Sequence, residues 1–121
     1  MYNILICDDE KDIVSAIEIY LKTAGYSVYK AYNGKEALKI IDNTELHLVI
    51  LDIMMPELDG ISVAEKVRKD KAIPIIMLSA KSEDYDKIKG LNVGADDYIT
   101  KPFNPEELIA RVRKFTNKKI H

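Results

Sequence analysis

Three aspartates stand at the ends of apolar runs that have the character of buried β-strands. Asp8 and Asp9 follow the run Asn3–Cys7, and Asp52 ends the run Leu46–Asp52 (LHLVILD). In a parallel sheet the carboxyl ends of the strands lie along one edge, so we expect these carboxylates to lie close together. Two carboxylates about 4 Å apart repel by roughly 4 kcal/mol at an effective dielectric constant of 20. Such a group needs either a raised pKa or a bound cation.

Two further polar side chains belong to the same predicted edge, because Ser79 ends the run Ile73–Ser79 and Lys101 follows Asp97–Thr100. Taken singly, an aspartate after a strand is commonly a helix cap, a serine a turn residue, and a lysine before proline a solvated side chain. Taken together, hard oxygen ligands without a neighbouring histidine favour Mg²⁺, or Mn²⁺, over zinc. A carboxylate beside such an ion, with a lysine and a hydroxyl to meet phosphoryl oxygens, is typical of a phosphoryl acceptor.

The segments that must position these residues alternate between strand-like and helix-like patterns. The predicted strands are Asn3–Cys7, Ser27–Tyr32, Leu46–Asp52, Ile73–Ser79 and Asp97–Thr100. The first, third and fourth runs are apolar without alternation, which indicates strands covered on both faces by crossover helices. The pattern predicts an α/β fold with a five-stranded parallel, doubly wound sheet. The strand order 2-1-3-4-5 is expected by analogy with other doubly wound proteins.

Helix boundaries are indicated by stripes and caps. The apolar stripe of the first helix is Ile13, Ile17, Leu21 and Ala24, and Gly25 is expected to end it. Three later helices are predicted to begin with a capping residue and an acid. These groups are Asn33 with Glu36, Ser82 with Glu83 and Asp84 (a helix closed by Gly94), and Asn104 with Pro105 and Glu107.

Composition limits the classes of function. The 121 residues, 47% of them hydrophobic and 31% charged, are expected to form one domain over 1–115, with 116–121 beginning a linker. The net charge of -2 argues against nucleic-acid binding by this domain. No apolar run approaches the roughly 20 residues of a membrane span. Cys7, the one cysteine, is expected to be a small buried hydrophobe. Without a basic-then-apolar leader, we expect a cytoplasmic protein with no membrane contact.

Considered together, these residues resemble the receiver domain of bacterial two-component response regulators. The similarity covers essentially the whole chain. It rests on the acidic pair after the first strand and on the motifs LDIMMPELDG, MLSAK and GADDYITKPF. It implies a CheY-like, flavodoxin-like fold that accepts a phosphoryl group from a phosphohistidine sensor kinase. Such a domain catalyses only its own phosphorylation and slow dephosphorylation, and is not an enzyme in the ordinary sense.

The resemblance also implies roles for individual residues. Asp52 would be phosphorylated, and Lys101 would pair first with it and then with the phosphoryl group. Asp9 and Asp52 would bind Mg²⁺ together with the main-chain carbonyl of Met54, while Asp8 would act mostly through water. Ser79 would be the switch hydroxyl that turns towards the phosphate, with Tyr98 rotating in concert. The Lys101–Pro102 peptide bond is expected to be cis.

The stretch GADDYITKPFNPEELIARVR is similar to the OmpR/PhoB-type transcriptional regulators. In that group the phosphorylated receiver dimerises through its fourth helix, fifth strand and fifth helix, and a winged-helix DNA-binding domain follows. The expected dimer face comprises Lys87, Ile88, Leu91, Asp96, Asp97, Glu107, Ala110, Arg111 and Arg113. The expected cross-subunit pairs are Asp97 with Arg111 and Lys87 with Glu107, around an apolar centre of Ile88, Leu91 and Ala110. The alternative to the dimer face is a solvated surface, and the alternative to an attached DNA-binding domain is a stand-alone receiver.

Three other functions are weighed against this one. A flavodoxin-like FMN carrier needs a hydroxyl-rich phosphate loop after the first strand, where this chain has CDDEKD. A haloacid-dehalogenase-type phosphatase needs a second acid two residues after its nucleophile, where this chain has Met54. A pseudo-receiver would signal without phosphate, although the residues that the chemistry needs are present.

Overall fold

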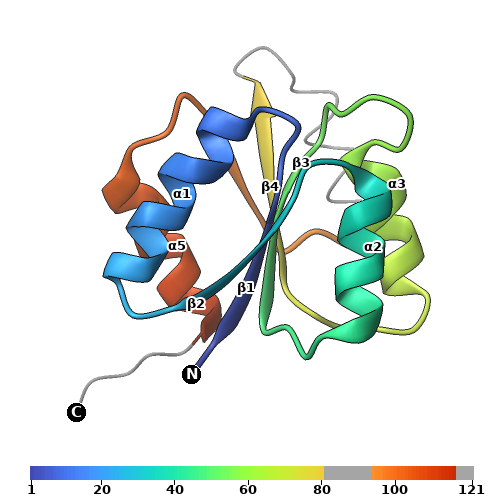
Figure 1. Cartoon of the computed structure of the whole chain (residues 1–121), viewed down its shortest axis with the longest axis horizontal. Coiled ribbons are helices and arrows are strands. Elements are labelled where there is room, and N and C mark those ends of the chain that lie inside the picture. Colours follow the sequence, from blue (N-terminus) through green and yellow to red (C-terminus); the bar gives the residue numbers. More distant parts are fainter. Residues whose placement is uncertain (81–93, 117–121) are drawn as a thin grey trace.

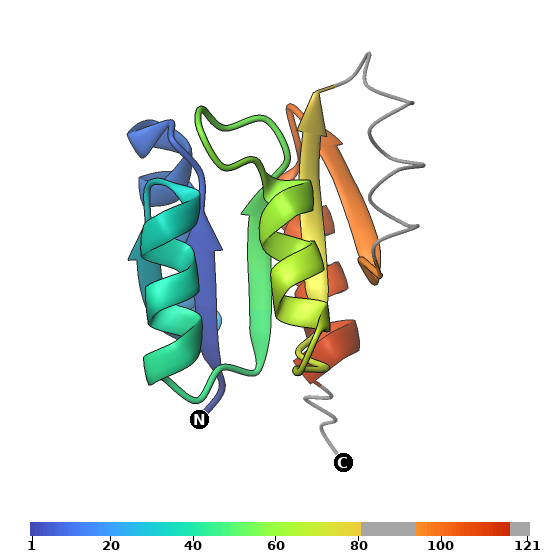
Figure 2. The same ribbon diagram turned by 90° about the vertical axis from the view of Figure 1, so that its right-hand side faces the viewer.

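The computed structural model describes residues 1–80 and 94–116. Five parallel strands form one sheet in the order β2-β1-β3-β4-β5 between two layers of helices. Figure 1 shows α1 and α5 on one face of the sheet and α2 and α3 on the other, and Figure 2 shows the same layers from the side. The predicted fold class and strand order are therefore confirmed. The elements are β1 Asn3–Cys7, α1 Lys11–Thr23, β2 Ser27–Ala31, α2 Gly34–Asn43, β3 Leu48–Asp52, α3 Gly60–Arg68, β4 Ile75–Ala80, β5 Asp97–Lys101 and α5 Pro105–Thr116.

Four strands differ from their predicted ends by one or two residues, while β1 is as predicted. β2 ends at Ala31 because the N–H of Tyr32 is donated to the Glu36 carboxylate (2.7 Å) and not to a strand. β4 begins at Ile75, since the preceding Pro74 has no N–H to donate. β3 begins at Leu48 instead of Leu46, β4 continues to Ala80, and β5 continues to Lys101.

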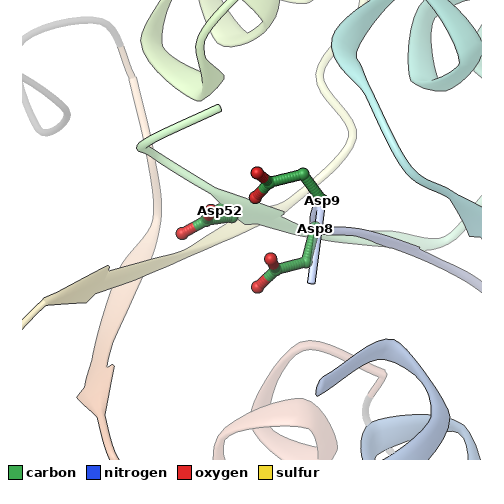
Figure 3. Close-up of side chains that lie close together, drawn as sticks. All are labelled: Asp8, Asp9 and Asp52. Atoms are coloured by element: carbon green, nitrogen blue, oxygen red, sulfur yellow. The ribbon is translucent and has the colours of Figure 1, made fainter. Parts of the chain in front are cut away.

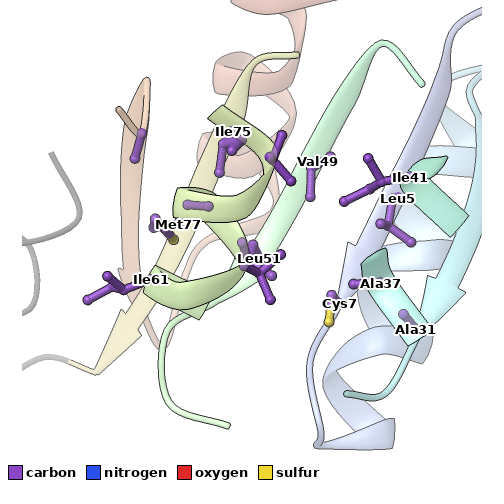
Figure 4. Close-up of a cluster of buried hydrophobic side chains, with 14 of the residues drawn as sticks. Leu5, Cys7, Ala31, Ala37, Ile41, Val49, Leu51, Ile61, Ile75 and Met77 are labelled. Atoms are coloured by element: carbon purple, nitrogen blue, oxygen red, sulfur yellow. The ribbon is translucent and has the colours of Figure 1, made fainter. Parts of the chain in front are cut away.

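The core has one apolar layer on each face of the sheet. Figure 4 shows the layer under α2 and α3, to which β1, β3 and β4 contribute Leu5, Leu51 and Met77. The layer under α1 and α5 is built in the same way from the opposite faces of these strands. Because the central strands are buried on both faces, their ends are held rigidly between the helix layers.

The first helix, α1, follows the predicted apolar stripe with one difference. α1 buries Val14, Ile17 and Leu21, so Val14 takes the buried place that the predicted stripe assigned to Ile13. Gly25, with φ of 93°, follows its end as predicted. The predicted helix from Ser82 lies outside the described residues. No helix in the described part of the chain is long and apolar enough to cross a membrane.

Asparagine caps open α2 and α5. The Asn33 side chain accepts from the Glu36 N–H (2.9 Å), as predicted. The Asn104 side chain accepts from the Glu106 N–H (2.7 Å). Glu107, expected to complete that cap, instead contacts Arg111 one turn along the helix (3.2 Å).

Candidate functional site

Strand register brings the predicted aspartates together at the carboxyl edge of the sheet. β1 and β3 are neighbouring strands, and Cys7 lies opposite Leu51. Asp8 and Asp52, the residues that follow this pair along the chain, are therefore adjacent. One carboxylate oxygen from each of Asp8, Asp9 and Asp52 lies within 4.8 Å of the other two. Figure 3 shows the three side chains converging from the ends of β1 and β3. The predicted acidic cluster therefore exists.

Lys101 provides the one ammonium group that contacts this cluster among the described residues. Its Nζ lies 2.9 Å from Asp8 Oδ2 and 3.2 Å from Asp52 Oδ1. A third carboxylate, that of Glu10, lies 3.5 Å away, a contact that the sequence did not suggest. With Asp9 also in the cluster, the carboxylates outnumber the cation, and the crevice has an excess of negative charge.

Burial and this excess charge shift the pKa values of the crevice. Burial raises the pKa of Asp52 to about 7, Asp8 adds repulsion, and Lys101 opposes the shift. Burial also raises the pKa of Asp8, against the stabilising N–H of Glu10 and the Lys101 ammonium. For Lys101, burial acts to lower the pKa, but its contacts with Asp8 and Asp52 outweigh burial and raise it. The crevice would be stabilised by further positive charge.

The donor set is compatible with a hard divalent cation. It consists of carboxylate oxygens, which Mg²⁺ and similar ions prefer. Cys7 lies beside the cluster, but burial, with repulsion from Asp8, raises the pKa of its thiol to about 12. The thiol therefore stays protonated at neutral pH in the metal-free protein. Met54 lies in the loop after β3 with an exposed side chain, and the metal role of its carbonyl stays a prediction.

Ser79 is the last residue but one of β4, and it is only 1% exposed. Within residues 1–80 and 94–116, its hydroxyl has no hydrogen-bond partner. A buried unpartnered hydroxyl costs about 1–3 kcal/mol, so it calls for a reason, such as a ligand oxygen that it will meet. Tyr98 on β5 is half-buried against the layer under α2 and α3, and its predicted rotation stays a prediction.

The loop between β3 and α3 returns close to the end of β3, where Asp52 lies. Gly60, the first residue of α3, lies so close to β3 that a Cβ there would be 2.1 Å from the main-chain oxygen of Asp52. Its N–H is donated to the oxygen of Ile53 (2.9 Å), and Asp59 caps α3 by accepting from Ser62 N–H (2.8 Å). This role of Gly60 was not predicted, although the LDG triplet of the sequence is a signal that could have suggested it. The Lys101–Pro102 bond is cis, as the resemblance implied.

Several residues of the expected dimer face already have partners in the same chain. Asp96 accepts from the N–H of Ile75 (2.8 Å) and from Arg68 (2.9 Å). Asp97 is paired with Arg111 within the chain, so a cross-subunit pair would have to exchange this contact. Ala110 and Arg113 are exposed on α5, whereas Lys87, Ile88 and Leu91 lie outside the described residues. The dimer face stays a prediction.

Comparison with known proteins decides the family. The model of the response regulator receiver domain matches residues 4–113 of the chain. The chain belongs to the response regulator receiver family. VanR of Enterococcus faecium is 54% identical over 110 residues, which cover 91% of this chain and 48% of that protein. VanRc of Enterococcus gallinarum is 46% identical over the same length. The receiver chain thus spans about half the length of the curated relatives that it matches.

Solved structures agree with the receiver fold. The receiver domain of the Francisella response regulator 1452 is 40% identical, with a TM-score of 0.90, over 98% of this chain and all of that one. DrrB of Thermotoga maritima, an OmpR/PhoB homolog, is 35% identical with a TM-score of 0.87, over 98% of this chain and 54% of that one. The similarity to DrrB supports the predicted resemblance to the OmpR/PhoB group.

The receiver family and particular residues both argue against two of the rival classes of function. A phosphatase of the haloacid-dehalogenase type would need a proton donor at Met54, whose thioether cannot supply one. A flavodoxin-like carrier would place a phosphate against Asp8 and Asp9, which would repel it unless a metal ion lay between them.

Proposed function

We propose that this receiver is a phosphorylation-activated switch, in which Asp52 accepts a phosphoryl group from the phosphohistidine of a sensor kinase. One observation carries the proposal. A carboxylate at the floor of the crevice lies among further carboxylates and a lysine ammonium, and the neighbouring strand β4 carries a buried hydroxyl that has no hydrogen-bond partner among the described residues. This arrangement supplies a nucleophile, a place for a hard cation, and donors for phosphoryl oxygens.

The residues of the chain have distinct roles in the transfer. An oxygen of Asp52 attacks the phosphorus while the bond to the histidine nitrogen breaks. Mg²⁺, held by Asp9 and Asp52 with the carbonyl of Met54, and by Asp8 through water, would neutralise negative charge on the transferring group. Mn²⁺ has the same preference for oxygen ligands. Lys101 exchanges a carboxylate for a phosphoryl oxygen, and the Ser79 hydroxyl donates to another.

The output is a change in the predicted dimer face, of which β5 and α5 lie in the described part of the chain. Attraction of Ser79 to the phosphoryl group, with rotation of Tyr98, biases this surface towards a homodimer. The exposed Ala110 and Arg113 on α5 are available to such an interface. We further propose that residues from 116 onward begin a linker to a winged-helix DNA-binding domain, through which a cytoplasmic regulator controls transcription. The relatives' names, which include the term regulatory protein, and their double length support this.

Intact mass spectrometry after incubation with acetyl phosphate and Mg²⁺ tests the proposal. Wild type should gain the mass of one phosphoryl group, and the gain should be absent with EDTA. Asp52→Asn should gain nothing under any condition. If folded wild type with Mg²⁺ gained no mass, the domain would be a pseudo-receiver and the roles of Ser79 and Lys101 would fall.

A further inference from the structure

Glu10 is the third carboxylate on the Lys101 ammonium, and the proposed transfer does not use it. Its oxygen lies 3.5 Å from Lys101 Nζ, against 2.9 Å for Asp8 and 3.2 Å for Asp52. An ammonium group has three N–H donors, and these three acids can occupy all of them. A phosphoryl oxygen can therefore bind Lys101 only by replacing one of the acids.

Glu10 is the acid that is easiest to replace. Its side chain is 63% exposed, whereas those of Asp8 and Asp52 are 0% and 6% exposed. A released Glu10 carboxylate is solvated at once by water, but a released Asp8 carboxylate would remain buried without its cation. Glu10 also has the longest of the three contacts. The first phosphoryl oxygen that reaches Lys101 thus competes with Glu10.

Glu10 also borders a hollow that Lys101 lines. The hollow is open and has a volume of about 420 Å³. The other described lining residues are Ile13, Ala80, Pro102 and Phe103. Among the described residues around this hollow, Glu10 is the one acid. A donor that enters here meets a negative charge beside the cation that it needs.

We propose that Glu10 selects phosphodonors by their charge, disfavouring acyl phosphates relative to donors with a phosphorus–nitrogen bond. The inference rests on the proposed function of Asp52. In both cases an Asp52 oxygen forms the new bond to phosphorus, and the electron pair of the broken bond goes to the leaving group. Acetyl phosphate, a dianion at neutral pH, releases acetate. Phosphoramidate carries one negative charge fewer because its nitrogen is protonated, and it releases ammonia, as a phosphohistidine releases imidazole.

The test compares rates of phosphorylation with the two donors in wild type, Glu10→Gln and Glu10→Lys, at low salt and saturating Mg²⁺. Removing one exposed, screened charge should accelerate reaction with the dianion by about threefold and with the less charged donor by under twofold. The ratio of acetyl phosphate to phosphoramidate rates should rise about twofold in Glu10→Gln and about threefold in Glu10→Lys. High salt should reduce both changes. The main-chain N–H of Glu10, which Asp8 accepts (2.9 Å), is retained in both variants.

Matched controls are Glu45→Gln and Glu45→Lys, because Glu45 is an exposed acid just before β3, at the opposite edge of the sheet. These variants change the net charge equally and should leave the ratio unchanged. A second readout is the equilibrium affinity for inorganic phosphate, which should rise about threefold in Glu10→Gln by NMR titration. An equal acceleration with both donors, or the same change in the Glu45 variants, would overturn the selection. Failure of wild type to react with either donor would instead overturn the proposed function.

Discussion

Two clusters of aspartate and cation lie at opposite edges of the same sheet, and they differ in balance. At the amino ends of β4 and β5, Arg68 donates to the oxygens of Gly94 (3.0 Å) and Lys71 (3.3 Å) and to Asp96 (2.9 Å). Asp96 also accepts from the N–H of Ile75 (2.8 Å). In this cluster the positive charge of Arg68 is matched by Asp96, and the donors have acceptors. These contacts connect α3 to the start of β4 and to the residues just before β5. A balanced cluster of this kind stabilises the fold.

The crevice at the carboxyl edge lacks this balance. Asp52 is 4% exposed, its neighbours include two further aspartates, and Lys101 is shared among several acids. Ser79 adds a buried hydroxyl without a partner among the described residues. Such an arrangement destabilises the free protein and leaves room for ligands that bring positive charge and phosphoryl oxygens. The difference indicates that residue type alone does not make a site, whereas unmet charge and hydrogen-bonding capacity do.

The largest expected effect is the pH dependence of stability in metal-free protein. The pKa of Asp52 is raised from 3.8 to about 7 in the folded protein, so the folded state binds a proton that the unfolded state has lost between these values. Its contribution to stability is therefore full below pH 4 and is lost as pH rises to about 7. Asp52→Asn should be more stable than wild type by about 2–4 kcal/mol at pH 8, with a smaller gain at pH 5.

Urea denaturation in EDTA at both pH values measures this gain. The comparison is sharpened by Asp96→Asn, which breaks the balanced cluster and should lower stability at both pH values. The interpretation of the crevice would be wrong if Asp52→Asn were less stable than wild type at pH 8.

A smaller effect is expected from Arg68→Ala in the balanced cluster. The substitution removes the hydrogen bonds to Gly94, Lys71 and Asp96, and should lower the free energy of unfolding by about 2 kcal/mol. The rate of phosphorylation by acetyl phosphate should stay within about twofold of wild type, because Arg68 is at the other edge of the sheet. Lys69→Ala, an exposed neighbour, is the control and should change stability by less than about 0.5 kcal/mol. If Arg68→Ala were folded but lost phosphorylation, the Arg68–Asp96 cluster could not be assigned a purely structural role.

The smallest effect concerns buried hydroxyl groups. Ser79→Ala should change stability by less than about 1 kcal/mol, or raise it slightly. The reason is that the Ser79 hydroxyl has no hydrogen-bond partner to lose among the described residues. Thr116→Val is the matched control, since the Thr116 hydroxyl bonds the Tyr26 hydroxyl (2.9 Å) and the Val112 oxygen (3.1 Å). It should lose about 1–2 kcal/mol in the same thermal or urea unfolding experiment. Equal losses in both variants would mean that Ser79 has a structural partner.

Most of the fold and the centre of the site could be predicted from sequence, for physical reasons. Apolar runs without alternation require cover on both faces, and parallel strands bring their carboxyl ends together, so Asp8, Asp9 and Asp52 had to meet. The contact of Glu10 with Lys101 could not be predicted, because it depends on the direction that the side chain takes from the extended residue just before α1. Likewise, the partners of Asp96 come from segments distant in the sequence, and pattern alone offered no sign of them.

Strand ends were the other weak point of prediction. Whether Tyr32 pairs with a strand depends on the competing carboxylate of Glu36, which periodicity does not register. The role of Gly60 depends on a main-chain approach to Asp52 that only the folded loop reveals.

Chemical mapping of the acceptor tests the central claim most directly. Wild type would be phosphorylated with acetyl phosphate and Mg²⁺, reduced with borohydride to convert an aspartyl phosphate to homoserine, and digested for peptide sequencing by mass spectrometry. The account predicts homoserine at position 52 alone, and none when EDTA is present. Homoserine at position 8 or 9, or a stable phosphoryl group on another residue while Asp52 is unmodified, would contradict it.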